Sequence, residues 1–366
     1  SATGDSTDVV LTYESVEYDS NYVVLLAQHA SYIAFKHLTI YPTGTDYGRG
    51  IAFGENADHI TITNCSFKGI YSTQNHSQFA SVFGTETRAD YLYFYNNRFD
   101  SVAMGIYLNG RLTDRINEVE VINNKFLNIG YQTMLFSRAY HGTIKNNEIQ
   151  GGYIGIRYGT SYERARILNN RIICKRTGIM YYSAGYLSEA GLIANNYIFI
   201  TDQGGQGLSI GGHSPVNIYH NTVILGDGEL NDYAFGISNF GGDNMVNVVN
   251  NIFACLNGGV PYYNAYHTNP LDTMDYNCYY TAGKFIGNEN GKKLFNLDDL
   301  KDYLGKDQHS FTAYPIFSPD TSVYLLTDWL NNKGLPLSPI AHDIDGKSRD
   351  PSHPDVGAAE IGRAHV

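Results

Sequence analysis

The sequence lacks the charge and hydropathy patterns of several large protein classes. It holds 25 basic against 36 acidic residues, a formal net charge of −11, whereas nucleic acids and anionic membrane surfaces require a concentrated basic surface. It also contains no apolar run long enough to cross a membrane as a helix. We therefore expect no nucleic-acid partner and no membrane insertion.

Cysteine is scarce, and its spacing excludes common cysteine sites. The four cysteines include no CxxC motif and no Cys/His cluster, so we expect no metal site built on them. Cys174 and Cys255 each follow a recurring Asn by four residues, three repeats apart, which is roughly 14 Å at strand spacing and too far for a disulfide. We expect free, buried thiols at Cys65, Cys174, Cys255 and Cys278.

What the chain does have is a recurring Asn pair, or a close variant, before a bulky apolar residue. The second member of the pair returns at intervals of 23 to 32 residues, and an interval of that size is typical of stacked-repeat folds. The pairs are Asn64-Cys65, Asn96-Asn97, Asn123-Asn124, Asn146-Asn147, Asn169-Asn170, Asn195-Asn196, His220-Asn221, Asn250-Asn251 and Tyr276-Asn277.

Each repeat reads as three short strands around that pair. Residues 119–122, 125–127 and 133–136 alternate apolar and polar side chains, which is the period of a β-strand. Strands this short are stable only when neighbouring repeats stack. Asn suits the corner because it tolerates the left-handed backbone region, and amides repeated about 4.8 Å apart can hydrogen-bond along the stack. We therefore predict an asparagine ladder of Asn97, Asn124, Asn147, Asn170, Asn196, Asn221, Asn251 and Asn277.

The strand that usually opens with Gly predicts which side chains form the core. Two columns are large and apolar and should point inward, while the column between them, Tyr107, Leu135, Arg157, Met180, Ser209 and Gly236, should be exposed. The inward columns are Ile106, Met134, Ile156, Ile179, Leu208 and Phe235, and Leu108, Phe136, Tyr158, Tyr181, Ile210 and Ile237.

These repeats over roughly residues 20–280 resemble the right-handed parallel β-helix of the pectate-lyase-like superfamily. Segments 191–196, 217–223 and 248–253 are similar to secreted bacterial β-helix repeat proteins of the Bacteroidetes type. The resemblance implies an all-β, right-handed parallel β-helix of about nine to ten coils, and a secreted or cell-surface bacterial location. It implies little about activity, because one fold hosts many functions.

The C-terminal part should close the solenoid. Asn296 is a suitable N-cap and Gly305 a suitable end for one short helix with Leu297, Leu300 and Leu304 on its apolar face. We predict a β-helix over residues 1–280 and a capping region over 281–360. Residues 361–366 resemble translated sequencing adapter and are expected to be non-native, and the start of the chain reads as the inside of a coil.

Asp343 and Asp345 precede Gly346 in an alternation that calcium loops use. The other oxygen ligands of such a loop are absent from the sequence, so a structural end-turn is favoured over calcium. In that turn Arg349 would pair with Asp355 or Glu360. No other cofactor is expected.

The candidate site residues are few. A polysaccharide lyase needs a group that neutralises a uronate and a base that removes the neighbouring proton, and Arg157, Tyr107, Tyr182, Arg138 and His141 are the weak candidates. A glycosidase needs two facing carboxylates, and the outward column contains none. The 31 Tyr against one Trp also offer flat rings for sugars, which predicts a ligand-binding ridge of Tyr107, Asn109, Arg157 and Tyr182.

Two functional hypotheses follow. The favoured one is a non-catalytic extracellular module of a larger secreted or surface protein that binds a polysaccharide or a neighbouring surface protein, with head-to-tail stacking into fibres as a variant. The alternative is a polysaccharide lyase or glycoside hydrolase acting on an extracellular glycan.

Overall fold

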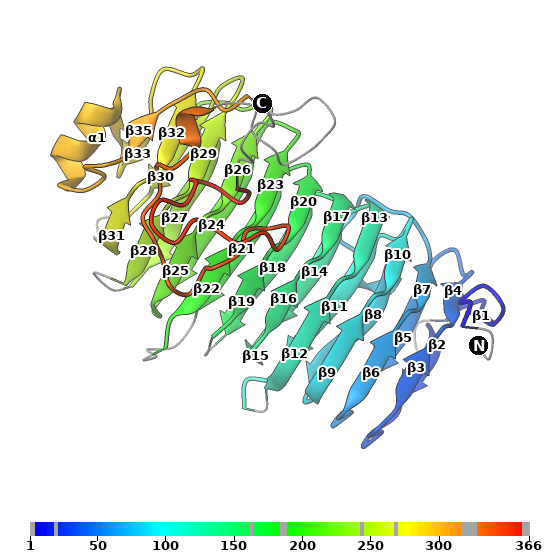
Figure 1. Ribbon diagram of the computed structural model, residues 1–366. Helices are drawn as coiled ribbons and strands as arrows, with labels where there is room; N and C mark the ends of the chain where they lie inside the picture. The colour runs from blue at the N-terminus through cyan, green and yellow to red at the C-terminus, as the bar shows by residue number, and fades with distance from the viewer. Residues whose placement is uncertain are drawn as a thin grey trace. The chain divides into compact units, whose positions relative to one another are not determined.

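A computed structural model shows that the chain is an all-β parallel solenoid of about ten turns, as predicted. It describes residues 4–17, 21–113, 115–161, 164–183, 189–241, 245–266, 270–316 and 328–360. The expected non-native tail, 361–366, lies outside these ranges. Each turn contributes strands to three parallel sheets, called A, B and C here (Figure 1).

The contacts group the residues into two compact units. The first comprises residues 1–166 and 179–185, and the second comprises 167–178 and 186–366. The sequence-based limit at residue 280 does not coincide with this grouping and stays a prediction. Strands β19 (Arg166–Leu168) and β21 (Thr177–Ser183) each run across the limit between the units.

In the first unit the three sheets hold these strands in order. Sheet A contains β1 (Val10–Tyr13), β4 (Thr39–Pro42), β7 (Ser66–Lys68), β10 (Arg98–Asp100), β13 (Lys125–Ile129) and β17 (Glu148–Gly151). Sheet B contains β2 (Tyr22–Leu26), β5 (Arg49–Phe53), β8 (Ala80–Thr87), β11 (Met104–Gly110), β14 (Gln132–Ser137) and β18 (Ile154–Ser161), with a 3-10 turn η1 (Ser77–Phe79) before β8. Sheet C contains β3 (Ala34–Lys36), β6 (Ile60–Thr63), β9 (Asp90–Tyr95), β12 (Ile116–Ile122) and β16 (Thr143–Lys145), and β15 (Ala139–Tyr140) also pairs with β12.

The second unit repeats this plan and then departs from it. Sheet A contains β20 (Arg171–Cys174), β23 (Tyr197–Ile200), β26 (Thr222–Leu225), β29 (Ile252–Cys255), β32 (Cys278–Thr281) and β35 (Phe311–Thr312). Sheet C contains β22 (Gly191–Ala194), β25 (Val216–Tyr219), β28 (Val246–Val249) and β31 (Leu271–Asp275). Sheet B contains β24 (Gln206–Gly212), β27 (Tyr233–Phe240), β30 (Val260–Asn264), β33 (Gly287–Glu289) and the antiparallel β34 (Lys292–Leu294).

The asparagine ladder is present, and the two members of each pair have different structural roles. The first member takes the left-handed backbone, as at Asn123 with φ 59°, while the second is buried inside the corner. In the first unit, the Asn97 side chain donates to Asn124 Oδ1 at 3.0 Å, and Asn124 donates to Asn147 Oδ1 at 3.1 Å. Cys65 N donates to Asn97 Oδ1, so the ladder begins at Asn97, as expected.

The same ladder runs through the second unit and ends on a carboxyl group. Asn221 donates to Asn251 Oδ1 at 3.0 Å, and Asn251 donates to Asn277 Oδ1 at 3.1 Å. Beyond the last coil, Asn277 N donates to Ser310 Oγ at 2.8 Å and Asn277 Nδ2 to Asp307 Oδ1 at 3.3 Å. The side chains of Ser310 and Asp307, which follow helix α1 (Leu297–Leu304), therefore accept the last hydrogen bonds of the ladder.

Both predicted inward columns are buried, with exposures of 2% or less. The outward column is exposed only in part, because Ser209 and Gly236 are buried. The Tyr233 ring covers them: its hydroxyl donates to Ser209 Oγ at 3.1 Å, and a Cβ on Gly236 would lie 2.2 Å from the ring. Sequence periodicity could not reveal that the Tyr233 side chain lies across the outer face of sheet B and covers these two positions.

The cysteines and the helix match their predictions. All four cysteines are free and buried, and Cys174 and Cys255 occupy the same column through Ile200 and Leu225. Helix α1 begins after Asn296, whose side chain accepts from the Asp299 backbone, and ends at Gly305 in the left-handed region.

Candidate functional site

Part of the predicted ridge lies on one face of sheet B in the first unit. Tyr107 pairs in register with Leu135, and Leu135 pairs with Arg157, so Tyr107 and Arg157 are two strand spacings, roughly 10 Å, apart. Arg157 is exposed and Tyr107 is half-buried. Tyr182, also half-buried, lies on β21, which follows β18 in the order of this sheet.

The ridge is longer than the sequence suggested, because aromatic packing extends it toward β5. The Tyr107 ring stacks on Phe83 with centroids 5.6 Å apart and planes 14° from parallel. The Arg49 guanidinium carbon lies 3.4 Å from the Phe83 centroid, a cation–π contact. Phe83, Tyr107 and Arg49 thus form one surface across three neighbouring strands.

Asn109 and Arg138 are brought together, but they bind each other. Arg138 Nη1 donates to Asn109 Oδ1 at 3.4 Å and to Gly110 O at 3.0 Å, and it pairs with Glu86 at 3.6 Å. These bonds fix the end of β11. Asn109 Oδ1 already accepts a hydrogen bond from Arg138, so it is less available to a ligand than the predicted ridge requires.

His141 belongs to a different surface, a pocket of about 410 Å³ beside sheet C. The pocket is lined by Arg88, Asp90, Thr113, Arg115, Asn117, Tyr140 and His141. His141 Nδ1 lies 3.0 Å from Asn117 Oδ1, and the Arg115 guanidinium carbon lies 4.8 Å from the Tyr140 centroid. Burial, followed by the charge of Asp58, raises the pKa of the Asp90 carboxyl. The pocket therefore combines two cations, a histidine and a tyrosine, which sequence reasoning did not group.

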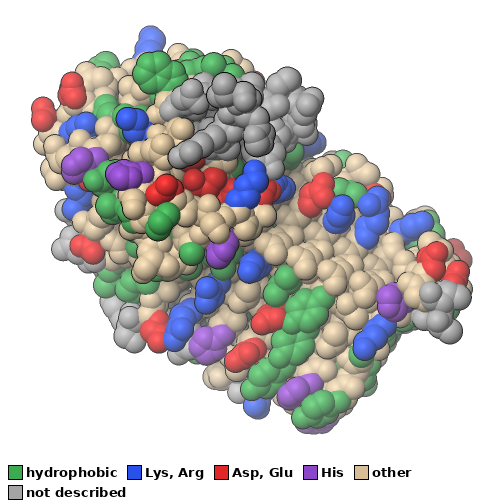
Figure 2. All heavy atoms as spheres, viewed as in Figure 1, with side chains coloured by type: hydrophobic (Ala, Val, Ile, Leu, Met, Phe, Trp, Pro, Cys, Tyr) green, Lys and Arg blue, Asp and Glu red, His purple; other side chains and the backbone are tan. Residues whose placement is uncertain are grey.

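Sequence reasoning also missed a row of tyrosines on β9. Tyr91, Tyr93 and Tyr95 are half-buried, whereas Leu92 and Phe94 between them are buried in the core. The Tyr93 and Tyr95 rings are stacked with centroids 5.8 Å apart. Figure 2 shows hydrophobic side chains, a class that includes Tyr, gathered in a stripe in the region of β9. The alternation Tyr-Leu-Tyr-Phe-Tyr was the signal that could have revealed it.

One end of this row continues into a second aromatic stack. The His59 ring lies between Tyr32 and Tyr91, with centroid distances of 4.3 and 4.5 Å, and Tyr32 is 79% exposed. At the other end, the Tyr95 hydroxyl donates to the Glu120 carboxylate. We call Tyr32, His59, Tyr91, Tyr93 and Tyr95 the tyrosine face.

In the second unit, residues 328–360 form a segment that lies over the corner of the Asn pairs (Figure 1, red). The first members of the pairs hold it. Asn195 Nδ2 donates to His342 O at 2.7 Å, and the Asn250 amide both donates to Leu335 O at 2.7 Å and accepts from Leu335 N at 2.8 Å. We call residues 328–360 the C-terminal strap.

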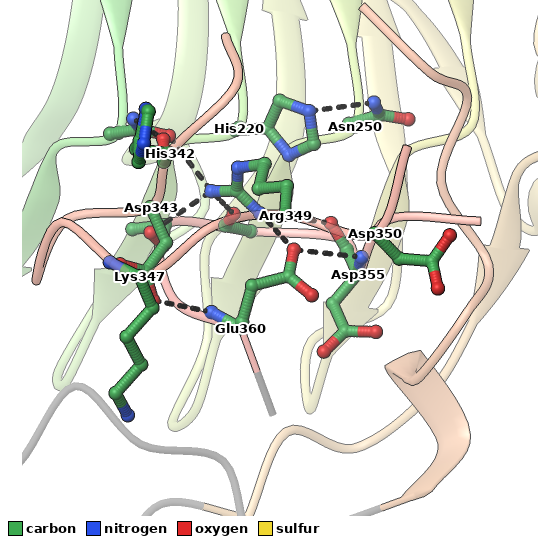
Figure 3. Close-up of polar contacts among 12 residues, drawn as sticks. His220, Asn250, His342, Asp343, Lys347, Arg349, Asp350, Asp355 and Glu360 are labelled. Atoms are coloured by element: carbon green, nitrogen blue, oxygen red, sulfur yellow. Dashed lines mark hydrogen bonds and ion pairs between the residues drawn. The ribbon is translucent and has the colours of Figure 1, made fainter. Parts of the chain in front are cut away.

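Arg349 is the centre of the strap (Figure 3). Its side chain is 3% exposed. Nη1 pairs with Glu360 at 2.8 Å, and Nη2 donates to Asn195 Oδ1 at 2.8 Å and to the carbonyls of Gly357 and Ala358 at 3.0 and 3.1 Å. Glu360 is one of the two partners that the sequence suggested.

The Asp343 side chain stabilises a turn near the end of the chain by accepting backbone hydrogen bonds. Its Oδ1 accepts from the backbone N–H groups of Asp345 and Lys347, at 2.9 and 2.8 Å, and its Oδ2 accepts from Glu360 N at 2.9 Å. Asp345 pairs with Arg171. Both carboxyl groups of the supposed calcium motif are thus used in holding the strap together and onto β20.

His220, which replaces Asn at a corner under the strap, is fully buried. Asn250 Nδ2 donates to its Nε2 at 2.9 Å, so the ring is neutral in this arrangement. Burial, and then the charge of Arg349, lower the pKa of His220 well below its ordinary value. The contacts of His220 are thus with the corner and the strap.

A further hollow of about 620 Å³ lies at the end of the second unit, between the last coil and α1. Its lining includes Tyr280, Phe295 and Tyr314, with Tyr280 and Tyr314 in edge contact at 4.8 Å. Within the ranges that the structure describes, no three His, Cys, Asp or Glu side chains are grouped so as to hold a metal ion. Across the same ranges, no helix has the length and apolar character needed to span a membrane.

The fold defines the class of the chain, a parallel β-solenoid. Comparison with models of protein families, with curated proteins and with solved structures finds no match.

Proposed function

We propose that this chain is a non-catalytic extracellular module that binds a polysaccharide. The observation that carries the proposal is the tyrosine face. Sugar rings stack on flat aromatic side chains and hydrogen-bond to neighbouring polar groups. The tyrosines of β9 offer both a ring and a hydroxyl. Their side chains lie on the outer side of sheet C, while Leu92 and Phe94 of the same strand are buried in the core.

The adjoining pocket adds polar groups to that face. Asp90 belongs to the same strand as Tyr91, and Asn117 of the pocket pairs in register with Asp90. Arg88 and Arg115 would favour a sugar with carboxylate or sulfate groups in spite of the acidic net charge, since a local basic site can bind an anion on an acidic protein. The ligand class that fits is therefore a polysaccharide with at least some anionic residues.

A glycan array followed by titration tests the proposal. Tyr93→Ala with Tyr95→Ala should weaken binding at least about tenfold, since each stacked ring contributes roughly 1 kcal/mol or more. Tyr41→Ala is the matched control, because Tyr41 is 40% exposed on β4 of sheet A. Tyr107→Ala with Tyr182→Ala tests the ridge on sheet B separately. Unchanged binding in both double variants would refute an aromatic site on either face.

A polysaccharide lyase is the second candidate, and the pocket of His141 favours it. A lyase needs cations around a uronate and a base beside them, and Arg88, Arg115, Tyr140 and His141 line one hollow. Appearance of unsaturated products from pectin or alginate, abolished by His141→Ala, would establish this function in place of the binding module. Binding without such products supports the module.

Head-to-tail stacking into fibres, the variant that the sequence suggested, has less support. The last strand of sheet B, β34, is antiparallel, and helix α1 contacts it. An incoming coil would meet these elements where it needs a free parallel edge.

A further inference from the structure

The corner of the Asn pairs is covered in the second unit and open in the first. Under the C-terminal strap, Asn195, His220 and Asn250 are buried. The equivalent residues of the first unit, Asn64, Asn96, Asn123 and Asn146, are all exposed, with φ between 53° and 59°. Within the described residues, none of these four side-chain amides makes a hydrogen bond.

The second unit shows what such a corner binds. Asn250 holds Leu335 by a pair of amide-to-backbone hydrogen bonds, and Asn195 and Asn169 donate to the carbonyls of His342 and Asp343. These bonds engage backbone groups of the strap, because each amide presents a donor and an acceptor to a peptide group. The strap also makes turns of its own, such as the one closed by Ile340 N donating to Leu337 O. An amide column on this corner is therefore a binding surface for polypeptide backbone.

The side chains beside the corner determine which polypeptide fits. In the second unit, the strap packs apolar residues such as Ile344 and Val356 against Tyr197, Ile224 and Ile252. Tyr197 and Ile252 directly follow a ladder Asn at the start of their strands. In the first unit the residues at this position are polar or charged and pair in register: Ser66, Arg98, Lys125 and Glu148. The open corner thus lacks the apolar surface that the strap requires.

The charges beside the open corner favour an acidic partner. Arg98 is 51% exposed and Lys125 61% exposed, and their pairs with Asp100 and Glu148 are surface contacts of little strength. At the equivalent position next to the covered corner, Arg171 pairs with Asp345 of the strap. A hollow of about 710 Å³ at Asn64 and Asn96 is lined by Lys68, Arg98 and His37 and by one acidic side chain, Asp5.

We infer that the corner formed by Asn64, Asn96, Asn123 and Asn146 binds an extended acidic polypeptide segment, by the amide-to-backbone bonds that hold the strap in the second unit. This inference is independent of polysaccharide binding by the tyrosine face. Each coil advances about 4.8 Å and an extended chain about 3.3 Å per residue. About five residues therefore span the four coils, with carboxylates directed toward Arg98 and Lys125.

The test uses a fluorescein-labelled peptide of alternating Asp and Ser, about ten residues long, titrated onto the whole chain and followed by fluorescence polarisation. Asn96→Gly with Asn123→Gly removes two amides while keeping a residue that tolerates the left-handed backbone. This variant should bind about tenfold more weakly or worse, since two hydrogen bonds are lost. Asn56→Gly is the matched control, because Asn56 has φ 55° at another corner and should change nothing.

The charge requirement is tested with an alternating Lys and Ser peptide and with salt. The acidic peptide should bind more tightly than the basic one, and its affinity should fall as sodium chloride rises, because exposed charges are screened. Three outcomes would overturn the inference: no binding of the acidic peptide, equal binding by the Asn96→Gly, Asn123→Gly variant, or displacement of the peptide by a neutral glycan that needs the same amides.

Discussion

Replacing Arg349 by Met should release the C-terminal strap from the corner of the second unit. The guanidinium is 3% exposed and joins the Glu360 carboxylate, Asn195 Oδ1 and two backbone carbonyls. Met occupies a similar volume but makes none of these bonds, so Glu360 would remain largely buried without its cation. Removing one partner of a buried ion pair costs about 3–5 kcal/mol. We expect a loss of that size for the strap and its corner.

Hydrogen exchange is the measurement of choice, because a solenoid can open locally without unfolding throughout. Faster exchange is expected at the backbone N–H groups of Leu335 and Gly357, which bond to Asn250, and unchanged exchange in the first unit. Arg349→Met combined with Glu360→Gln should be less damaging than the single variant, since no unpaired charge remains. A loss below about 1 kcal/mol in the single variant, or a double variant that is no better, would refute this account of the strap.

Two further predictions concern the ladder. Burial raises the pKa of Asp307 to about 6 from the unfolded value of about 3.8, so its stabilising effect is full below about pH 4 and is lost as pH rises through about 6, by roughly 3 kcal/mol. Urea unfolding at pH 4 and pH 7 should show a smaller difference for Asp307→Asn than for the unchanged chain, and an equal difference would contradict the shift. Asn221→Ala should cost about 3–5 kcal/mol, because it leaves Ile193 O and Asn196 N without partners inside the corner. A matched exposed change, Asn123→Gly, should cost less than about 1 kcal/mol in the same urea titration.

The ladder could be predicted from sequence because one residue type returns at one backbone position. A corner in the left-handed region favours Asn, and a buried amide that repeats with every coil can bond to its equivalents in the neighbouring coils. Asn97 as the first member of the ladder followed from Cys65 alone. The inward columns followed from the same count.

The strap could not be predicted in this way, because residues 328–360 contain no repeat. A weaker signal existed: along one outward position of sheet A, charged residues such as Arg98 and Lys125 give way to Tyr197 and Ile252. An outward column that turns apolar indicates a covered surface. What covers it depends on contacts between residues more than 80 positions apart, such as Asn250 and Leu335.

The candidate site was predicted only in part. Tyr107 and Arg157 do share a face, but His141 lies in the pocket beside sheet C, which a single-strand count could not show because its residues come from several loops and strands. The β9 part of the tyrosine face could have been predicted from the alternation of Tyr with apolar residues at positions 91–95. Its extension to Tyr32 and His59 required the register between coils.

The direction of the ladder has a consequence for repeat number. Within the described part of each unit, the backbone N–H of a ladder Asn donates to Oδ1 of the following Asn, so a coil can be added or removed inside a unit without reversing this bond. At the last coil, Asn277 donates to Ser310 and Asp307 in place of a following Asn. A shortened or lengthened solenoid should fold when this acceptor pair is grafted after its final Asn, and should fray at that end when it is not.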